Sequence, residues 1–136
     1  MKKWRIEPAF TDDRGSISDI FYDRQIDHVA IIRSAKGVVR GSHYHKETTQ
    51  WMFMTKGRMH YAFQNLDGTT GGNVMVEEGE IVETPPFEIH ELYFPNDNTE
   101  FVEFMVFATG KRGGEDYESD TFRVPRIRDY SSGLYE

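Results

Sequence analysis

The apolar residues of this chain come in short runs, and this pattern limits the possible folds more than any other feature. The runs are rich in Val, Ile, Phe, Tyr and Met, and they lie at residues 26–32, 51–54, 59–63, 74–76, 81–82 and 101–107. Turn residues such as Asp67-Gly68 and Glu78-Gly79, which tolerate positive φ, separate them. No amphipathic run is long enough to predict a helix. The pattern indicates an all-β domain, either a sandwich or a closed barrel.

The second half of the chain adds two expectations. Residues 101–107 are apolar on nearly both faces, which predicts a central strand. Residues 109–120 are polar and Gly-rich and predict a loop, followed by a C-terminal tail over 122–130 that packs back on the domain. A chain of 136 residues has the usual size of one domain, so we expect a single domain over residues 1–136.

Composition and charge exclude several classes of function. The chain has no cysteine, so any metal must be held by nitrogen and oxygen ligands. Lys plus Arg number 16 and Asp plus Glu number 23, and the resulting charge of −7 disfavours binding to nucleic acid. The basic N-terminus lacks the apolar stretch of a signal peptide, and no apolar run has membrane length. We therefore expect a cytoplasmic protein that does not bind membranes.

The residues that can carry chemistry are mainly histidines. His43 and His45 are two residues apart, so in a strand their side chains share one face. Gln50 follows them, and a third histidine, His90, comes after the turn at Pro85. An imidazole with a pKa of about 6.5 can both remove and return a proton at neutral pH.

These residues resemble the two sequence motifs of the cupin superfamily. The first motif is matched by Gly37, His43, His45, Gln50 and Gly57, and the second by Gly79, Pro85, Phe87, His90 and Phe94. Gln50, Phe87 and Phe94 replace the Glu, Gly and Asn of the family pattern. The resemblance implies a small jelly-roll β-barrel in which His43, His45, Gln50 and His90 converge, often on a metal.

A narrower resemblance covers most of the chain. The stretches Asp13-Arg14-Gly15-Ser16, Arg40-Gly41-x-His43-x-His45-Lys46 and Ile127-Arg128-Asp129-Tyr130, together with Gln50, are similar to nucleotide-sugar 3,4-ketoisomerases and 3,5-epimerase-like cupins. This implies a homodimeric isomerase or epimerase that acts on a nucleoside-diphosphate 4-keto-6-deoxy sugar in surface-polysaccharide biosynthesis, by histidine acid-base chemistry. The family's tyrosine before the Arg-Gly-x-His-x-His motif is absent, and Tyr44, Tyr61 and Tyr93 are possible substitutes.

Roles for the remaining residues follow from this reading. His43 is the expected base and His45 its partner, while Arg40 and Arg14 are expected to bind the anionic substrate, although the nearby Asp12 and Asp13 suit a surface ion pair for Arg14 equally well. Gln50 is also expected to bind substrate. A neutral Gln50 compensates a dication less than Glu does, so no cofactor is expected. His28 and His60 are expected to serve structure or surface, and Trp51 to face away from the barrel interior.

Two other functions fit the same residues. One is a metal-dependent cupin, for example an oxygenase, in which His43, His45, Gln50 and His90 hold Zn, Ni or Fe. The other is a sugar-binding module without catalytic activity.

Overall fold

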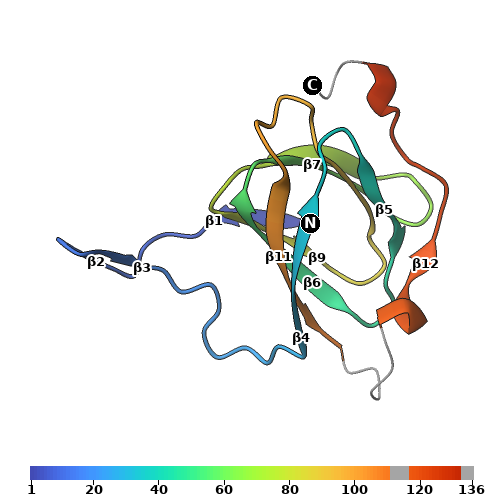
Figure 1. Ribbon diagram of the computed structural model, residues 1–136. Coiled ribbons are helices and arrows are strands. Elements are labelled where there is room, and N and C mark those ends of the chain that lie inside the picture. Colours follow the sequence, from blue (N-terminus) through green and yellow to red (C-terminus); the bar gives the residue numbers. More distant parts are fainter. Residues whose placement is uncertain (111–116, 133–136) are drawn as a thin grey trace.

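Two antiparallel sheets make up most of the computed structural model, which describes residues 1–110 and 117–132 (Figure 1). The strands are β1 (Lys2–Arg5), β2 (Phe10–Asp12), β3 (Gly15–Ile17), β4 (His28–Ser34), β5 (Val39–Tyr44), β6 (Thr49–Lys56), β7 (Met59–Gln64), β8 (Gly71–Val76), β9 (Glu80–Thr84), β10 (Ile89–Tyr93), β11 (Val102–Thr109) and β12 (Phe122–Arg123). Two short 3₁₀ helices, η1 (Tyr117–Asp120) and η2 (Tyr130–Ser132), lie in the C-terminal tail.

The sheets have the orders β1-β9-β6-β11-β4 and β12-β5-β10-β7-β8, and a separate two-stranded sheet joins β2 to β3. Apolar side chains from the inner faces of the two five-stranded sheets form the main core: Met52, Met54, Met59, Tyr61, Val76, Val82, Leu92, Phe94, Val102, Phe104 and Val106. The architecture is the all-β jelly-roll barrel that the sequence predicts. β11 pairs with both β6 and β4, so the prediction of a central strand is also confirmed.

A second apolar cluster lies on the outer face of the first sheet. Trp51, Ile81 and Phe107 form it, and Ile20, Phe21 and Ile26, which precede β4, pack against it. Trp51 is only 1% exposed, and its Nε1–H donates a hydrogen bond of 2.9 Å to Glu83. Trp51 therefore faces away from the barrel interior, as expected, and the chain itself covers it.

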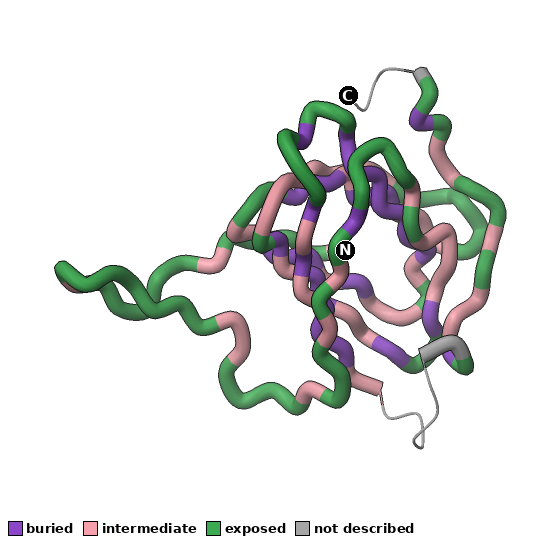
Figure 2. Tube along the Cα trace, in the orientation of Figure 1, coloured by how far each residue is buried: buried purple, intermediate pink, exposed green. Residues whose placement is uncertain are grey.

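The β2–β3 hairpin extends away from the barrel (Figure 1), and Figure 2 shows it as almost entirely exposed. Phe10 and Ile17, which are paired across the hairpin, are 53% and 62% exposed. Apolar side chains with this exposure on a projecting arm are available for contact with another surface.

The C-terminal tail packs back on the barrel, as the sequence predicts. β12 pairs with β5, and the backbone N–H of Val124 donates to the carbonyl of Ser42 at 2.9 Å. Farther along, the buried carboxylate of Glu91 accepts hydrogen bonds from the Ile127 N–H and the Tyr130 hydroxyl. Much of the loop predicted over 109–120 lies outside the described residues. Within residues 1–110 and 117–132, no helix is long and apolar enough to cross a membrane.

Candidate active site

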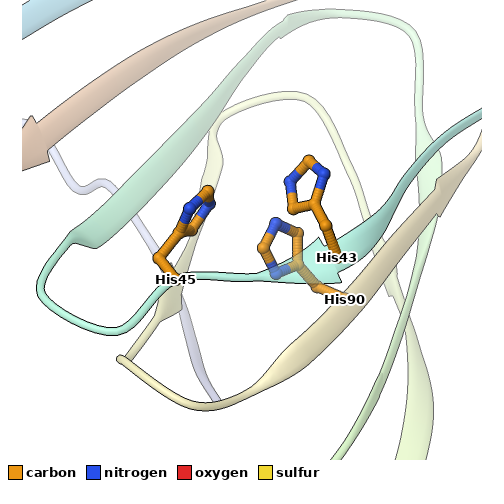
Figure 3. A group of neighbouring side chains, drawn as sticks. All are labelled: His43, His45 and His90. Atoms are coloured by element: carbon orange, nitrogen blue, oxygen red, sulfur yellow. The ribbon is translucent and has the colours of Figure 1, made fainter. Parts of the chain in front are cut away.

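Strands β5 and β10 bring three histidines together inside the barrel (Figure 3). His43 lies on β5 opposite His90 of β10, and His45 follows the end of β5. The ring centroids are 4.6 Å apart for His43 and His90, 5.0 Å for His43 and His45, and 5.3 Å for His45 and His90. One nitrogen from each ring lies within 4.8 Å of the other two.

A β-bulge sets this arrangement. The partners of His90 and Glu91 on β5 are His43 and Gly41, so Ser42 is an extra residue without a partner on β10. Gly41 and Ser42 both have positive φ, of 92° and 62°. The Ser42 hydroxyl donates to Glu91 at 2.9 Å, on the outer side of the strand pair. Bulges of this kind redirect neighbouring side chains, and here His43 and His90 point into the barrel.

The backbone fixes the proton position on two of the imidazoles. His45 Nδ1 lies 2.8 Å from the carbonyl oxygen of Asp120, and His90 Nδ1 lies 3.2 Å from that of Glu88. A carbonyl oxygen only accepts hydrogen bonds, so each Nδ1 carries the proton and donates it. Both Nε2 atoms are buried and have no hydrogen-bond partner within residues 1–110 and 117–132. In the neutral ring, each Nε2 therefore presents a free lone pair.

His90 is held in the neutral state. Burial, followed by the proximity of His43 and His45 as potential cations, lowers the pKa of His90 well below its ordinary value of 6.5. Its lone pair is therefore available at neutral pH as a hydrogen-bond acceptor or a metal ligand.

The histidines line a cavity of about 500 Å³. It is lined by His28, Ala30, Ile32, Arg40, Gly41, His43, His45, Gln50, Met52, His90, Leu92, Phe104, Val106, Thr121 and Arg123. The predicted convergence of His43, His45, Gln50 and His90 in one barrel cavity is confirmed, and Arg40 joins them. The roles that the sequence predicts for these residues stay predictions.

The sequence did not predict three further polar residues that line the cavity, His28, Thr121 and Arg123. His28 was expected to serve structure or surface; it is exposed, in agreement with a surface position, and it also lines the cavity. The alternation of His28, Ala30 and Ile32 along β4 could have identified it, since all three face the cavity. Thr121 and Arg123 come from the tail, whose path no local sequence signal specifies.

Other predicted residues lie elsewhere. The Arg14 side chain is 82% exposed on the β2–β3 hairpin and pairs with Asp12 at 2.6 Å, so it does not reach the cavity of its own chain. Tyr44 stacks on Phe122, Tyr93 stacks between His60 and Tyr130, and the Tyr61 hydroxyl bonds with Thr84 and Glu88. None of the three tyrosines lines the cavity, so none replaces the absent family tyrosine there.

The cavity differs in charge from the rest of the chain. Its lining contains two arginines and four histidines but no carboxylate among the described residues, although the chain carries a net charge of −7. Arg40 Nε also donates to the Ser34 hydroxyl at 3.2 Å, which helps to orient its guanidinium. The walls therefore favour a ligand with an anionic group, which planar guanidinium groups bind well.

The same residues fit a divalent metal ion. His45 and His90 each present an unpartnered, buried Nε2, and each has its Nδ1–H bound to a backbone carbonyl, the usual outer contact of a metal-bound histidine. His43 provides the third nitrogen, and Gln50 lines the cavity beside them. Neutral imidazoles suit Zn, Cu, Fe or Ni.

The barrel and its inward-facing histidines define a fold of the cupin type. The chain belongs to the family described as the polysaccharide biosynthesis C-terminal domain, whose model matches residues 10–113. A curated relative, UDP-2-acetamido-2,6-beta-L-arabino-hexul-4-ose reductase from Pseudomonas aeruginosa, is 29% identical over 105 residues. That match covers 74% of this chain and 27% of the relative, so the chain spans about a quarter of that protein's length.

Solved structures with the same fold include two nucleotide-sugar enzymes. A mutant of the 3,4-ketoisomerase QdtA from Thermoanaerobacterium thermosaccharolyticum, solved with TDP-4-keto-6-deoxyglucose, has a TM-score of 0.71 and 19% identity, covering 90% of this chain and 86% of that one. The 3,5-epimerase RmlC from Legionella pneumophila, solved with dTDP-4-keto-L-rhamnose, has a TM-score of 0.69 and 16% identity, covering 90% and 71%. At this identity the likeness supports the fold.

Proposed function

We propose that this domain isomerises or epimerises a nucleoside-diphosphate 4-keto-6-deoxy sugar in polysaccharide biosynthesis. The observation that carries the proposal is the cluster of three imidazoles in a cavity lined by arginines and no described carboxylate. The imidazoles can move protons, and the arginines can hold a diphosphate. The family description and the keto sugars in the names of the similar proteins support the same substrate class.

Both reactions begin with removal of the proton on the carbon beside the carbonyl. His43 is the proposed base, because it lines the cavity and is less buried than His45 and His90. The resulting enolate can be reprotonated at the same carbon from the opposite face, which inverts that centre. Alternatively, its hydroxyl proton moves to the former carbonyl oxygen and the former carbonyl carbon is protonated, which moves the carbonyl. His45 is the proposed partner that returns the proton.

The other polar residues have positioning roles in this proposal. Arg40 binds the diphosphate, and Arg123, which lines the same cavity from β12, binds it as well. The amide of Gln50 can donate a hydrogen bond to the sugar carbonyl, which stabilises the negative charge that forms there. The similar proteins are named with different nucleotides and different sugars, so the proposal leaves open which nucleotide and which sugar this domain uses.

A second candidate is the same reaction with a divalent metal ion, held by His43, His45 and His90 with Gln50 beside them. The free, buried Nε2 atoms of His45 and His90 favour it. A bound ion would polarise the carbonyl of the keto sugar. The two candidates compete for one lone pair, because a His43 nitrogen that binds metal cannot act as the base.

Deuterium exchange tests the reaction. The protein is incubated in deuterium oxide with UDP- and TDP-linked 4-keto-6-deoxy sugars, and uptake at the carbon beside the carbonyl is followed by NMR. We expect exchange with the wild type and a loss of about 10²–10⁴-fold in His43→Asn, because the variant keeps a polar side chain but has no titratable base. His60→Asn, on β7 and outside the cavity lining, is the matched control and should keep full activity.

Two outcomes would change the proposal. If the wild type binds the nucleotide sugar without any deuterium uptake, the domain is a sugar-binding module. If exchange survives in His43→Asn, the reaction stands and His45 becomes the base to test.

Metal analysis separates the two candidates. Protein purified without added metal is analysed for Zn, Ni and Fe, and exchange is measured before and after treatment with a chelator. Metal-free acid-base catalysis predicts that activity survives complete metal removal. Near-stoichiometric metal together with loss of activity on chelation would establish the metal-dependent alternative.

We also propose that the domain works as a homodimer in the cytoplasm. The projecting β2–β3 hairpin exposes Phe10 and Ile17, and Val29 and Ile31 on the edge strand β4 are 54% and 62% exposed. A second copy could cover both apolar surfaces.

A further inference from the structure

Asp120, at the end of η1, binds the loop that follows His45. Its buried carboxylate accepts hydrogen bonds from three consecutive backbone amides, those of Lys46, Glu47 and Thr48, at 2.9, 3.0 and 3.0 Å, and from the Thr48 hydroxyl at 2.8 Å. Four donors on one side chain hold the loop and the tail segment in a fixed relation.

The main chain of the same residue contacts the candidate active site. The carbonyl oxygen of Asp120 accepts the Nδ1–H of His45 at 2.8 Å. Asp120 therefore uses its side chain to fix the backbone on one side of His45 and its carbonyl to fix the imidazole itself.

The residues after Asp120 continue this contact along β5. Arg123 pairs with His43 and Phe122 with Tyr44 in the β12–β5 ladder. The family match ends at residue 113, before this segment begins.

The charge state of Asp120 suits this position. Burial alone would raise the pKa of Asp120, but the hydrogen bonds from Lys46, Thr48 and Glu47 outweigh it and hold the pKa below its ordinary value. Asp120 is thus a carboxylate that can accept all four hydrogen bonds at neutral pH.

We propose that Asp120 is a positioning residue that holds His45 in the Nδ1–H tautomer, with the Nε2 lone pair directed into the cavity. The other neutral tautomer would place a lone pair against the Asp120 carbonyl and a proton on Nε2, where His45 must first accept the proton that it later returns, or bind a metal ion. The effect of this tautomer on turnover rests on the proposed function. The assignment of the tautomer itself rests only on the contact between His45 Nδ1 and the Asp120 carbonyl.

NMR of protein with ¹⁵N-labelled histidine, at a pH where the imidazoles are neutral, tests the proposal directly. The variants are Asp120→Ala and Asp120→Asn, which remove all or part of the acceptor group, and Thr48→Val, which removes one donor. The matched control is Asp67→Ala, since Asp67 accepts a backbone N–H and a hydroxyl from Thr69 in a turn that does not line the cavity.

In the wild type and in Asp67→Ala, we expect His45 to show a protonated Nδ1 and a bare Nε2. In Asp120→Ala, the ¹⁵N chemical shifts of His45 Nδ1 and Nε2 should move toward each other as the two tautomers mix. Asp120→Asn and Thr48→Val should give shifts between those of the wild type and Asp120→Ala. The kcat for deuterium exchange should fall about 10–100-fold in Asp120→Ala, which is the usual loss when the partner that orients a functional histidine is removed.

A merely structural role would have a different signature. A tail loosened without any effect on His45 would displace Arg123, raise KM and leave the tautomer unchanged. The proposal is overturned if His45 keeps the wild-type tautomer in folded Asp120→Asn, and this variant decides the test if Asp120→Ala does not fold. If the wild type exchanges no deuterium with any keto sugar, the proposed function fails while the NMR measurement still decides the role of Asp120.

Discussion

Tyr61 shows how a residue outside the cavity supports one inside it. Its ring lies parallel to that of His90 at a centroid distance of 6.2 Å and is fully buried. Its hydroxyl donates to Glu88 at 2.9 Å and accepts from Thr84 at 2.6 Å, while the Glu88 carbonyl accepts the Nδ1–H of His90. Tyr61 and Glu88 thus fix the ring of His90 from behind.

The ionisation of Tyr61 predicts a loss of stability in alkali. Burial, followed by the negative charge of Glu88, raises the pKa of Tyr61 well above 10.0. Above pH 10 the unfolded chain releases this proton and the folded protein retains it, so stability falls as pH rises, by up to about 1.4 kcal/mol per pH unit. Below pH 10, where Tyr61 is protonated in both the folded and the unfolded chain, its hydrogen bonds contribute their full stabilisation.

Urea unfolding at pH 8 and pH 11 measures this effect. At pH 8, Tyr61→Phe should be less stable than the wild type by about 1–3 kcal/mol, because Glu88 and Thr84 lose a buried partner. At pH 11 the difference should shrink or vanish. Tyr22→Phe, at a position 81% exposed, is the control and should follow the wild type at both values. A difference for Tyr61→Phe that stays constant with pH would contradict the argument.

The pairing of β5 with β10 is the element on which the site depends most. At Gly41 a Cβ atom would lie 2.8 Å from the carbonyl oxygen of His90, and the φ of 92° is one that residues with a side chain rarely adopt. The absence of a side chain at this position therefore lets β10 approach β5 closely enough for His90 to meet His43.

Gly41→Ala should consequently damage both stability and the site. We expect a destabilisation of about 2–4 kcal/mol, from backbone strain together with the contact on β10, and a loss of the His43–His90 contact. Gly15→Ala separates the two causes, because Gly15 also has positive φ, 136°, but a Cβ there meets nothing within 4 Å. Thermal unfolding should show a clearly smaller loss for Gly15→Ala, and equal losses would show that the close approach of β10 contributes nothing.

The sequence predicts the central residues of the site better than the complete set of residues that line the cavity. His43, His45, Gln50 and His90 could be placed together because strand alternation and two spaced motifs are local signals. Phe87 replaces the motif glycine, yet it keeps a φ of 65°, so the turn before His90 survives the substitution. Arg123 and Thr121 could not be predicted, since the path of the tail depends on hydrogen bonds between residues more than 70 positions apart, such as Asp120 with Thr48.

At the scale of the whole molecule, the β2–β3 hairpin is the feature that the barrel does not explain. It buries little of its own apolar surface, since Phe10 and Ile17 are both more than half exposed. A two-stranded hairpin is marginally stable alone in water, which favours its docking on a second copy of the chain.

Ile17→Asp should weaken the proposed dimer. Sedimentation velocity at micromolar concentration should give a dimer for the wild type and a shift toward monomer for this variant, because a charge would be buried in the interface. Leu66→Asp, at a position 49% exposed on the β7–β8 connection, is the control and should remain dimeric. A wild type that sediments as a monomer would contradict the proposal.

The C-terminal tail also determines where this fold can be divided or joined to another polypeptide. A chain that stopped at residue 113, the end of the family match, would lack Asp120, β12 and Tyr130. The amides of residues 46–48 would lose their acceptor, and the Glu91 carboxylate would keep only the Ser42 hydroxyl of the three hydrogen-bond donors that it has among the described residues. The loss of these hydrogen bonds and of the tail that covers this part of the barrel would destabilise the fold. In a gene fusion or a domain exchange, the portable unit therefore extends through Tyr130.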